Sequence, residues 1–110
     1  EKQEKFKVIC IDSGFHIKSV TDISAGGARF TPVDFRELTK AVLNSGTDIV
    51  ILAHNHPDSP NTPSQEDVTL TREVMRYMRC LGVTVLDHYI TGKNGTISMR
   101  NCGLIHDMEC

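Results

Sequence analysis

Runs of apolar residues divide the chain into strands and helices. Residues 6–11 form a short apolar run with β-branched side chains, and residues 15–23 roughly alternate between apolar and polar positions. Both patterns are typical of strands, and the Asp12-Ser13-Gly14 turn between them predicts a hairpin. Residues 49–53 form an unbroken apolar run that is too short for a helix. This run therefore predicts a buried central strand.

Two segments have the spacing of amphipathic helices. The first is expected to begin with Thr31 as N-cap and Pro32 in the first turn, and to end at Gly46. Its apolar positions recur at helical spacing: Phe35, Leu38, Ala41 and Val42. The second helix is expected to open at Ser64 and to stop at Gly82.

Two further strands complete the pattern. Residues 83–90 and 96–99 read as strands, and the Gly-Lys-Asn-Gly sequence at 92–95 predicts the turn between them. The expected order is β-β-α-β-α-β-β, a mixed β-sheet flanked by two helices in the α/β (α+β) class. Residues 54–62 then form a polar loop after the most buried strand, where open sheets usually place their ligands.

That loop carries the clearest chemistry in the sequence. His54 and His56 are two residues apart at the end of a strand, so their side chains point the same way. Asp67 lies in the first turn of the next helix and can fold back over the same point. Two nitrogen ligands and one oxygen ligand leave one position of a tetrahedral zinc ion open, as in catalytic sites. We therefore expect one Zn²⁺ per chain.

Ser64 and Asp67 also have a structural interpretation. Ser-x-x-Asp is a variant of the capping box, which stabilises a helix N-terminus without any catalytic role. Asp67 can serve both the cap and a metal, whereas the two demands compete for the Ser64 hydroxyl.

The motif His-Asn-His-Pro at 54–57, followed by Ser-Gln-Glu-Asp at 64–67, resembles the JAMM signature of MPN-domain metallopeptidases. Together with Leu-Asp-His-Tyr-Ile-Thr-Gly at 86–92 and the closing segment 97–105, it looks like the RadC branch of that family. The resemblance covers residues 4 to about 105. One departure is the Asp58-Ser59 pair, where the family pattern usually continues with Ser-Gly.

The resemblance implies an activity and roles for particular residues. The family places a Glu upstream as general base, and Glu4 in Glu-Lys-Phe matches that position. The family's Ser helps to hold the oxyanion beside the zinc, and Ser64 matches it. Asp87 and His88 match the family's Asp-His and are candidates for orienting a metal ligand, although a solvent-facing pair at a strand edge is an equal alternative.

The expected function is a zinc-dependent hydrolase of the metallopeptidase or isopeptidase type, with a peptide or protein-conjugate substrate. The alternative is a non-catalytic metal-binding module of a DNA-repair-associated RadC-like protein. A nuclease is excluded, because nucleases named for His-Asn-His spread these residues over a ββα unit. A zinc deaminase is excluded because its Pro-Cys-x-x-Cys ligands are absent.

Composition limits the partners that we expect. The 110 residues suffice for one domain over 1–110, which we expect to be the C-terminal part of a longer protein. The net charge of −2 gives no support for DNA binding, so any DNA contact is expected to be indirect or through a missing N-terminal region. No apolar segment is long enough to predict membrane association. The four cysteines are expected to be reduced thiols in the cytoplasm. The sequence leaves the oligomeric state open.

Overall fold

A computed structural model describes residues 4–25 and 32–105 of the chain. It contains two helices and five strands in the expected order β-β-α-β-α-β-β. The elements are β1 (Phe6–Ile11), β2 (Ile17–Asp22), α1 (Phe35–Ser45), β3 (Ile49–Asn55), α2 (Gln65–Cys80), β4 (Thr84–Gly92) and β5 (Gly95–Ser98). Neither helix in these ranges is long and apolar enough to cross a membrane.

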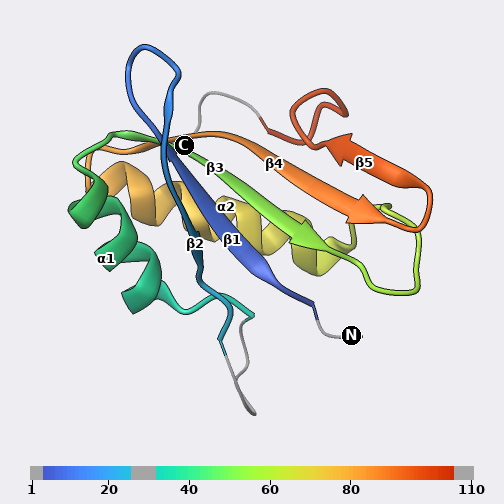
Figure 1. Cartoon of the computed structure of the whole chain (residues 1–110). Helices are drawn as coiled ribbons and strands as arrows, with labels where there is room; N and C mark the ends of the chain where they lie inside the picture. Colours follow the sequence, from blue (N-terminus) through green and yellow to red (C-terminus); the bar gives the residue numbers. More distant parts are fainter. Residues whose placement is uncertain (1–3, 26–31, 106–110) are drawn as a thin grey trace.

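The five strands form one mixed sheet in the order β2-β1-β3-β4-β5 (Figure 1). Strand β3 lies at the centre, antiparallel to β1 and parallel to β4. The unbroken apolar run thus occupies the central strand, as predicted. The antiparallel pairing also brings the start of β1 beside the carboxyl end of β3, because Phe6 lies opposite His54.

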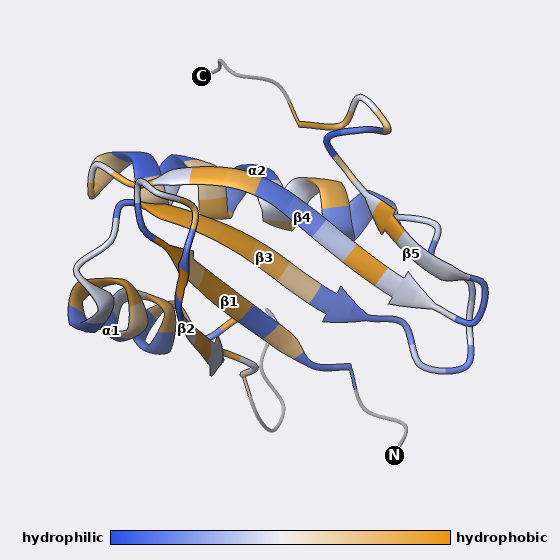
Figure 2. Ribbon diagram, turned by 45° about the horizontal axis from the view of Figure 1, so that its top comes forward, coloured by the Kyte–Doolittle hydropathy of each residue, from blue (hydrophilic) through white to orange (hydrophobic). Residues whose placement is uncertain are grey.

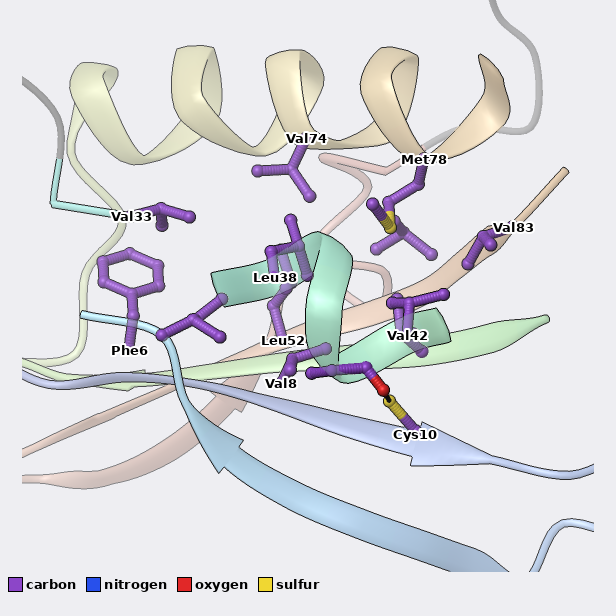
Figure 3. Close-up of a cluster of buried hydrophobic side chains, with 14 of the residues drawn as sticks. Phe6, Val8, Cys10, Val33, Leu38, Val42, Leu52, Val74, Met78 and Val83 are labelled. Atoms are coloured by element: carbon purple, nitrogen blue, oxygen red, sulfur yellow. Dashed lines mark hydrogen bonds between the residues drawn. The ribbon is translucent and has the colours of Figure 1, made fainter. Parts of the chain in front are cut away.

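Both helices contribute to one hydrophobic core on one face of the sheet. Buried and partly exposed residues alternate along β3, so Val50 and Leu52 point to the same side. Figure 3 shows side chains of both helices gathered above β1 and β3, with Val74 and Met78 from α2 and Leu38 from α1. This core lies directly before the end of β3, because Val50 and Leu52 are the strand residues next to His54 on the same face.

The start of α1 differs from the sequence prediction. Asp34, and not Thr31, is the N-cap, because its carboxylate accepts hydrogen bonds from the backbone N–H groups of Arg36 and Glu37. Pro32 lies before the helix and outside its first turn. Thr31 itself lies outside the described residues. Gly46 ends the helix in a left-handed conformation with φ of 69°, as the sequence predicted.

Strand β3 extends two residues further than the apolar run. It continues through His54 and Asn55, which pair with Ile90 and Thr91 of β4. His54 is therefore a strand residue and not the first residue of a loop. The parallel ladder with β4 holds it, and its backbone is correspondingly fixed.

A register shift in β4 decides which of its side chains face the core. Val85 lies opposite Val50, but the next pair is Asp87 with Ile51, so Leu86 is skipped. As a result, His88 lies opposite Leu52 on the core face, together with His54. Without this bulge, the two-residue period of a strand would turn His88 to the opposite face of the sheet from Val85.

Candidate metal centre

Two histidines mark the carboxyl end of β3, where the strand changes from hydrophobic to hydrophilic residues (Figure 2). His54 is buried, and the backbone N–H of His56 donates to the Thr91 carbonyl oxygen at 2.7 Å. This bond continues the parallel ladder past the end of the strand. The two imidazole rings therefore remain on one side, with centroids 4.8 Å apart.

Asp67 reaches the same point from the first turn of α2. Its Oδ1 atom lies 3.3 Å from His54 Nε2, and its Oδ2 atom lies 3.1 Å from His56 Nε2. The capping box at the start of α2 orients this carboxylate, because Oδ2 also accepts from the Ser64 backbone N–H at 2.8 Å. The structure thus brings together the three residues that were predicted as metal ligands; their role as ligands stays a prediction.

The charge state of Asp67 suits a metal ligand. Burial of the carboxyl group opposes its ionisation, but the adjacent His54 ring and the Ser64 N–H outweigh burial and hold the pKa of Asp67 well below its usual value. Asp67 is consequently a carboxylate at neutral pH and offers an oxygen donor.

Glu4 lies at the open side of this cluster. One carboxylate oxygen of Glu4 and one ring nitrogen each of His54 and His56 all lie within 4.8 Å of one another. The backbone N–H of Lys5 donates to Asn55 Oδ1 at 2.6 Å, which ties the start of β1 to the end of β3. Glu4 itself is exposed. Its place fits either a general base or a further ligand, and the sequence-based assignment as base is a prediction.

The donor set fits a metal ion. His54 Nε2 is fully buried, yet it makes no hydrogen bond with good geometry, although Asp67 lies close by. Buried polar atoms usually find a partner, so an orphaned ring nitrogen facing a carboxylate calls for a ligand. Imidazole nitrogens with a carboxylate oxygen are ligands that zinc accepts.

The orientation of His56 depends on the following loop. Its Nδ1 atom lies 2.9 Å from the Pro60 carbonyl oxygen. Because a carbonyl can only accept, Nδ1 carries a proton. Nε2 lies within hydrogen-bond distance of Asp67 Oδ2, at 3.1 Å, and is the ring atom with which a neutral His56 would bind a metal ion. The loop is tied to the β4–β5 turn, since Asn61 Nδ2 donates to the Gly95 carbonyl and Lys93 N–H donates to the Ser59 carbonyl.

The loop also requires a glycine at position 92. A Cβ atom on Gly92 would lie 2.4 Å from the backbone nitrogen of Asn61 and 2.5 Å from the carbonyl carbon of Pro60. These are backbone atoms that cannot move aside cheaply. The bare Gly92 therefore permits the close approach that places the Pro60 carbonyl against His56.

Aromatic rings surround His54 on the core side. The Phe6 ring stacks on it with centroids 4.2 Å apart and planes 11° apart. His54 Nδ1 lies 2.8 Å from His88 Nε2, and His88 Nδ1 lies 2.7 Å from Thr71 Oγ1. Burial is the main cause that lowers the pKa of His88 to about 3, and a protonated His54 ring would lower it further, so the His88 ring is neutral near pH 7.

Asp87 and His88 have separate surroundings. The Asp87 carboxylate accepts from the Ser98 hydroxyl and from the backbone N–H groups of Arg100 and His88. These bonds hold β4, β5 and the following turn together. Of the pair proposed to orient a ligand, His88 therefore contacts a predicted ligand directly, whereas the Asp87 contacts stabilise the sheet.

Ser64 has its hydroxyl in the capping box. The oxygen accepts from the Asp67 backbone N–H at 3.0 Å. This contact uses a lone pair and not the hydroxyl hydrogen, so capping does not consume the donor that an oxyanion would need. The competition expected from the sequence is therefore less severe, because the two roles use opposite sides of the same hydroxyl group.

Sequence reasoning missed three residues of this site: Phe6, Thr71 and Gly92. Thr71 gives a weak signal, since it lies four residues after Asp67 on the same helix face and β-branched residues are poor helix formers. Phe6 and Gly92 belong to motifs quoted for the family resemblance, but their roles could not be predicted, because each acts through a contact with a segment that is distant in sequence.

The cysteines show no disulfide within the described residues. Cys10 is buried, Cys80 and Cys102 are exposed, and all three are free thiols. Cys110 lies outside the described ranges.

Comparison with known proteins agrees with the fold and the motif. The family model of the RadC-like JAB domain matches residues 1–104. A UPF0758 protein of Desulfitobacterium hafniense is 35 % identical over 103 residues, which cover 94 % of this chain and 45 % of that protein. UPF0758 proteins of Clostridium botulinum and Symbiobacterium thermophilum are 36 % and 37 % identical, over 94 % and 93 % of this chain and 45 % and 44 % of theirs.

The chain spans a little under half the length of the curated relatives that it matches. The family match covers the whole cluster of Glu4, His54, His56 and Asp67. By this match over nearly its full length, the chain belongs to the RadC-like JAB domain family.

Proposed function

We propose that this domain is a zinc-dependent hydrolase of amide or isopeptide bonds. One observation carries the proposal: two imidazole Nε2 atoms face the two oxygens of one carboxylate at 3.3 and 3.1 Å, and one of these nitrogens is buried without a hydrogen bond. His54, His56 and Asp67 would hold the ion. A zinc ion supplies Lewis-acid activation of water and of a carbonyl group.

The spacing of these atoms is compatible with a tetrahedral metal ion such as zinc. With bonds of about 2.0–2.1 Å, two ligand atoms of a tetrahedral zinc lie roughly 3.3–3.4 Å apart. The observed contacts of Asp67 with His54 and His56 are close to that length. Three protein ligands leave a further position for water or substrate, which is the arrangement of catalytic rather than structural zinc sites.

Two further residues supply the remaining chemistry. Glu4 lies beside both histidines on the exposed side, where its carboxylate can take a proton from water and pass it to the leaving amine. The Ser64 hydroxyl hydrogen, which the capping contact leaves unused, can donate to a developing oxyanion. A peptide or a protein conjugate joined through a lysine side chain is the substrate class that this chemistry suits.

The test starts from metal content. The purified untagged chain is loaded with zinc, passed through a desalting column and measured by mass spectrometry, for the parent and for His56→Ala and His16→Ala. His16 is the matched control, because it is an exposed histidine whose ring contacts Asp12 and not the cluster. We expect about one zinc per chain in the parent and in His16→Ala, and little in His56→Ala.

Hydrolysis is then measured with a fluorescence-quenched peptide joined through a lysine ε-amide and with its linear counterpart. Cleavage that is abolished by His56→Ala and retained in His16→Ala supports the hydrolase. Stoichiometric zinc with no cleavage of either probe favours the alternative, a metal-binding module without its own activity. Absence of zinc from the parent chain would contradict both.

A further inference from the structure

A chain of hydrogen bonds runs from His54 away from the cluster and returns to α2. His54 Nδ1 meets His88 Nε2 at 2.8 Å, His88 Nδ1 meets Thr71 Oγ1 at 2.7 Å, and Thr71 Oγ1 lies 2.7 Å from the Asp67 backbone carbonyl oxygen. His88 and Thr71 are almost fully buried, with exposed fractions of 0 % and 1 %. No solvent competes for these groups, so each bond needs one donor and one acceptor.

The direction of the chain follows from its last member. A carbonyl oxygen can only accept, so the single hydrogen of the Thr71 hydroxyl points to the Asp67 carbonyl. The other neighbour, Met99 Sδ, is a weaker acceptor and lies farther away at 3.7 Å. Having used its hydrogen, the Thr71 oxygen must accept from His88. The proton of the His88 ring is therefore on Nδ1.

This assignment fixes the proton positions of the two imidazole rings in turn. A neutral imidazole carries one proton, so His88 Nε2 is an acceptor, and the proton between the rings belongs to His54 Nδ1. With this proton on Nδ1, a neutral His54 ring has none on Nε2, the buried atom that faces Asp67 at 3.3 Å. We propose that His88 and Thr71 are positioning residues, which hold His54 in the single tautomer whose Nε2 lone pair points into the metal centre.

The two histidines of the centre reach the same tautomer by different means. A backbone carbonyl, that of Pro60, holds His56, whereas a relay of two side chains holds His54. The relay returns to the backbone of Asp67, so it also couples the orientation of His54 to the first turn of α2. Side-chain substitutions in the relay can therefore remove the partner of His54, whereas the partner of His56 is a backbone carbonyl that no side-chain substitution removes.

The inference rests on the proposed metal function for its purpose, but the tautomer exists without a metal. The first readout is therefore the ¹⁵N spectrum of the metal-free chain labelled in its histidines. Long-range proton–nitrogen correlations at about pH 8, above the ordinary imidazole pKa of about 6.5, distinguish protonated from unprotonated ring nitrogens. We expect His54 with a proton on Nδ1 and none on Nε2. The reverse tautomer in the parent chain would overturn the proposal.

Matched variants test the relay. Thr71→Val removes the hydroxyl with little change in shape, and Thr71→Ser keeps the hydroxyl. His88→Gln keeps a carbonyl for His54 and an amide N–H for Thr71, whereas His88→Leu keeps neither. Circular dichroism and amide spectra establish folding, and the threonine pair preserves the test if His88→Leu does not fold. We expect mixed tautomers of His54 in Thr71→Val and the parent tautomer in Thr71→Ser and His88→Gln.

Zinc affinity is the second readout, measured by competition with a chromophoric chelator. We expect Thr71→Val and His88→Leu to bind zinc about 10–100-fold more weakly than Thr71→Ser and His88→Gln. Equal affinity and an unchanged tautomer in Thr71→Val would refute the positioning role. If the parent binds no zinc but shows the expected tautomer, the proposed function fails while the relay stands.

Discussion

The Phe6 ring lies flat against the His54 imidazole, with centroids 4.2 Å apart and an angle of 11° between the planes. Phe6 belongs to the first strand and is almost fully buried. It joins the hydrophobic core to the candidate metal centre, because one side of the ring packs among core residues and the other covers His54. Replacement of this ring should therefore affect both stability and metal binding.

We expect Phe6→Leu to lower the free energy of unfolding by about 1–2 kcal/mol, because it removes buried area and the ring stacking. It should also weaken zinc binding, since His54 gains rotational freedom. The matched control is Met78→Leu, a core change in α2. Urea unfolding measures the stability of both variants, and zinc competition measures their zinc affinity. Equal zinc affinity in both variants would show that the stacking does not orient His54.

Gly92→Ala is expected to displace the loop after β3. The added Cβ would lie 2.4 Å from the Asn61 backbone nitrogen, so the loop that carries the Pro60 carbonyl must shift. We expect a loss of about 1–3 kcal/mol in stability and weaker zinc binding through His56. Gly14→Ala is the control, since its Cβ would come closest to the His16 side chain, at 3.0 Å. Thermal denaturation measures the stability of both variants, and zinc titration measures their affinity. Identical zinc affinities would argue against a role of the loop in orienting His56.

Glu4→Gln should separate metal binding from hydrolysis. If Glu4 is the general base, the variant retains about one zinc per chain and loses activity by roughly 100-fold or more. Glu66→Gln is the matched control, because Glu66 is exposed in the first turn of α2 beside Asp67 in sequence. Metal content and cleavage of the lysine-linked peptide are measured together. Loss of zinc from Glu4→Gln would instead identify Glu4 as a ligand.

The stability of the metal-free domain should fall as the pH decreases below about 6.5. The pKa of His88 is lowered from 6.5 to about 3 on folding, so in this interval the unfolded chain binds a proton that the folded domain does not. Stability therefore rises with pH between these values. The Asp67 shift has the same sign but acts only below its ordinary pKa of 3.8. Between about pH 4 and 6.5, the change in stability therefore reports the contribution of His88 without that of Asp67.

Urea unfolding at about pH 7 and pH 5 measures this effect. From pH 7 to pH 5, we expect the free energy of unfolding to fall by on the order of 2 kcal/mol more in the parent than in His88→Gln, because the glutamine does not titrate. The same loss in both proteins would show that other groups dominate the acid sensitivity of the fold.

Much of the architecture could be predicted because it depends on local periodicity. The apolar run at 49–53 lies in the central strand, and Gly46 and Ser64 are at the helix ends where their residue types predicted. The start of α1 was misplaced, since Thr31-Pro32 and Asp34 are both reasonable helix starts. Only the backbone hydrogen bonds to the Asp34 carboxylate decide between them.

The sequence by itself determined the elements and the candidate chemistry, because the periods of strands and helices and the spacing of His54, His56 and Asp67 are properties of short segments. Only the tertiary structure decided what surrounds that chemistry. The bulge that skips Leu86 turns His88 toward His54, and the parallel pairing of β3 with β4 brings them within hydrogen-bond distance. The packing of α2 on the sheet then brings Thr71 to His88. These contacts join residues 17 and 34 positions apart, and such pairings follow from register and packing, which no local pattern encodes.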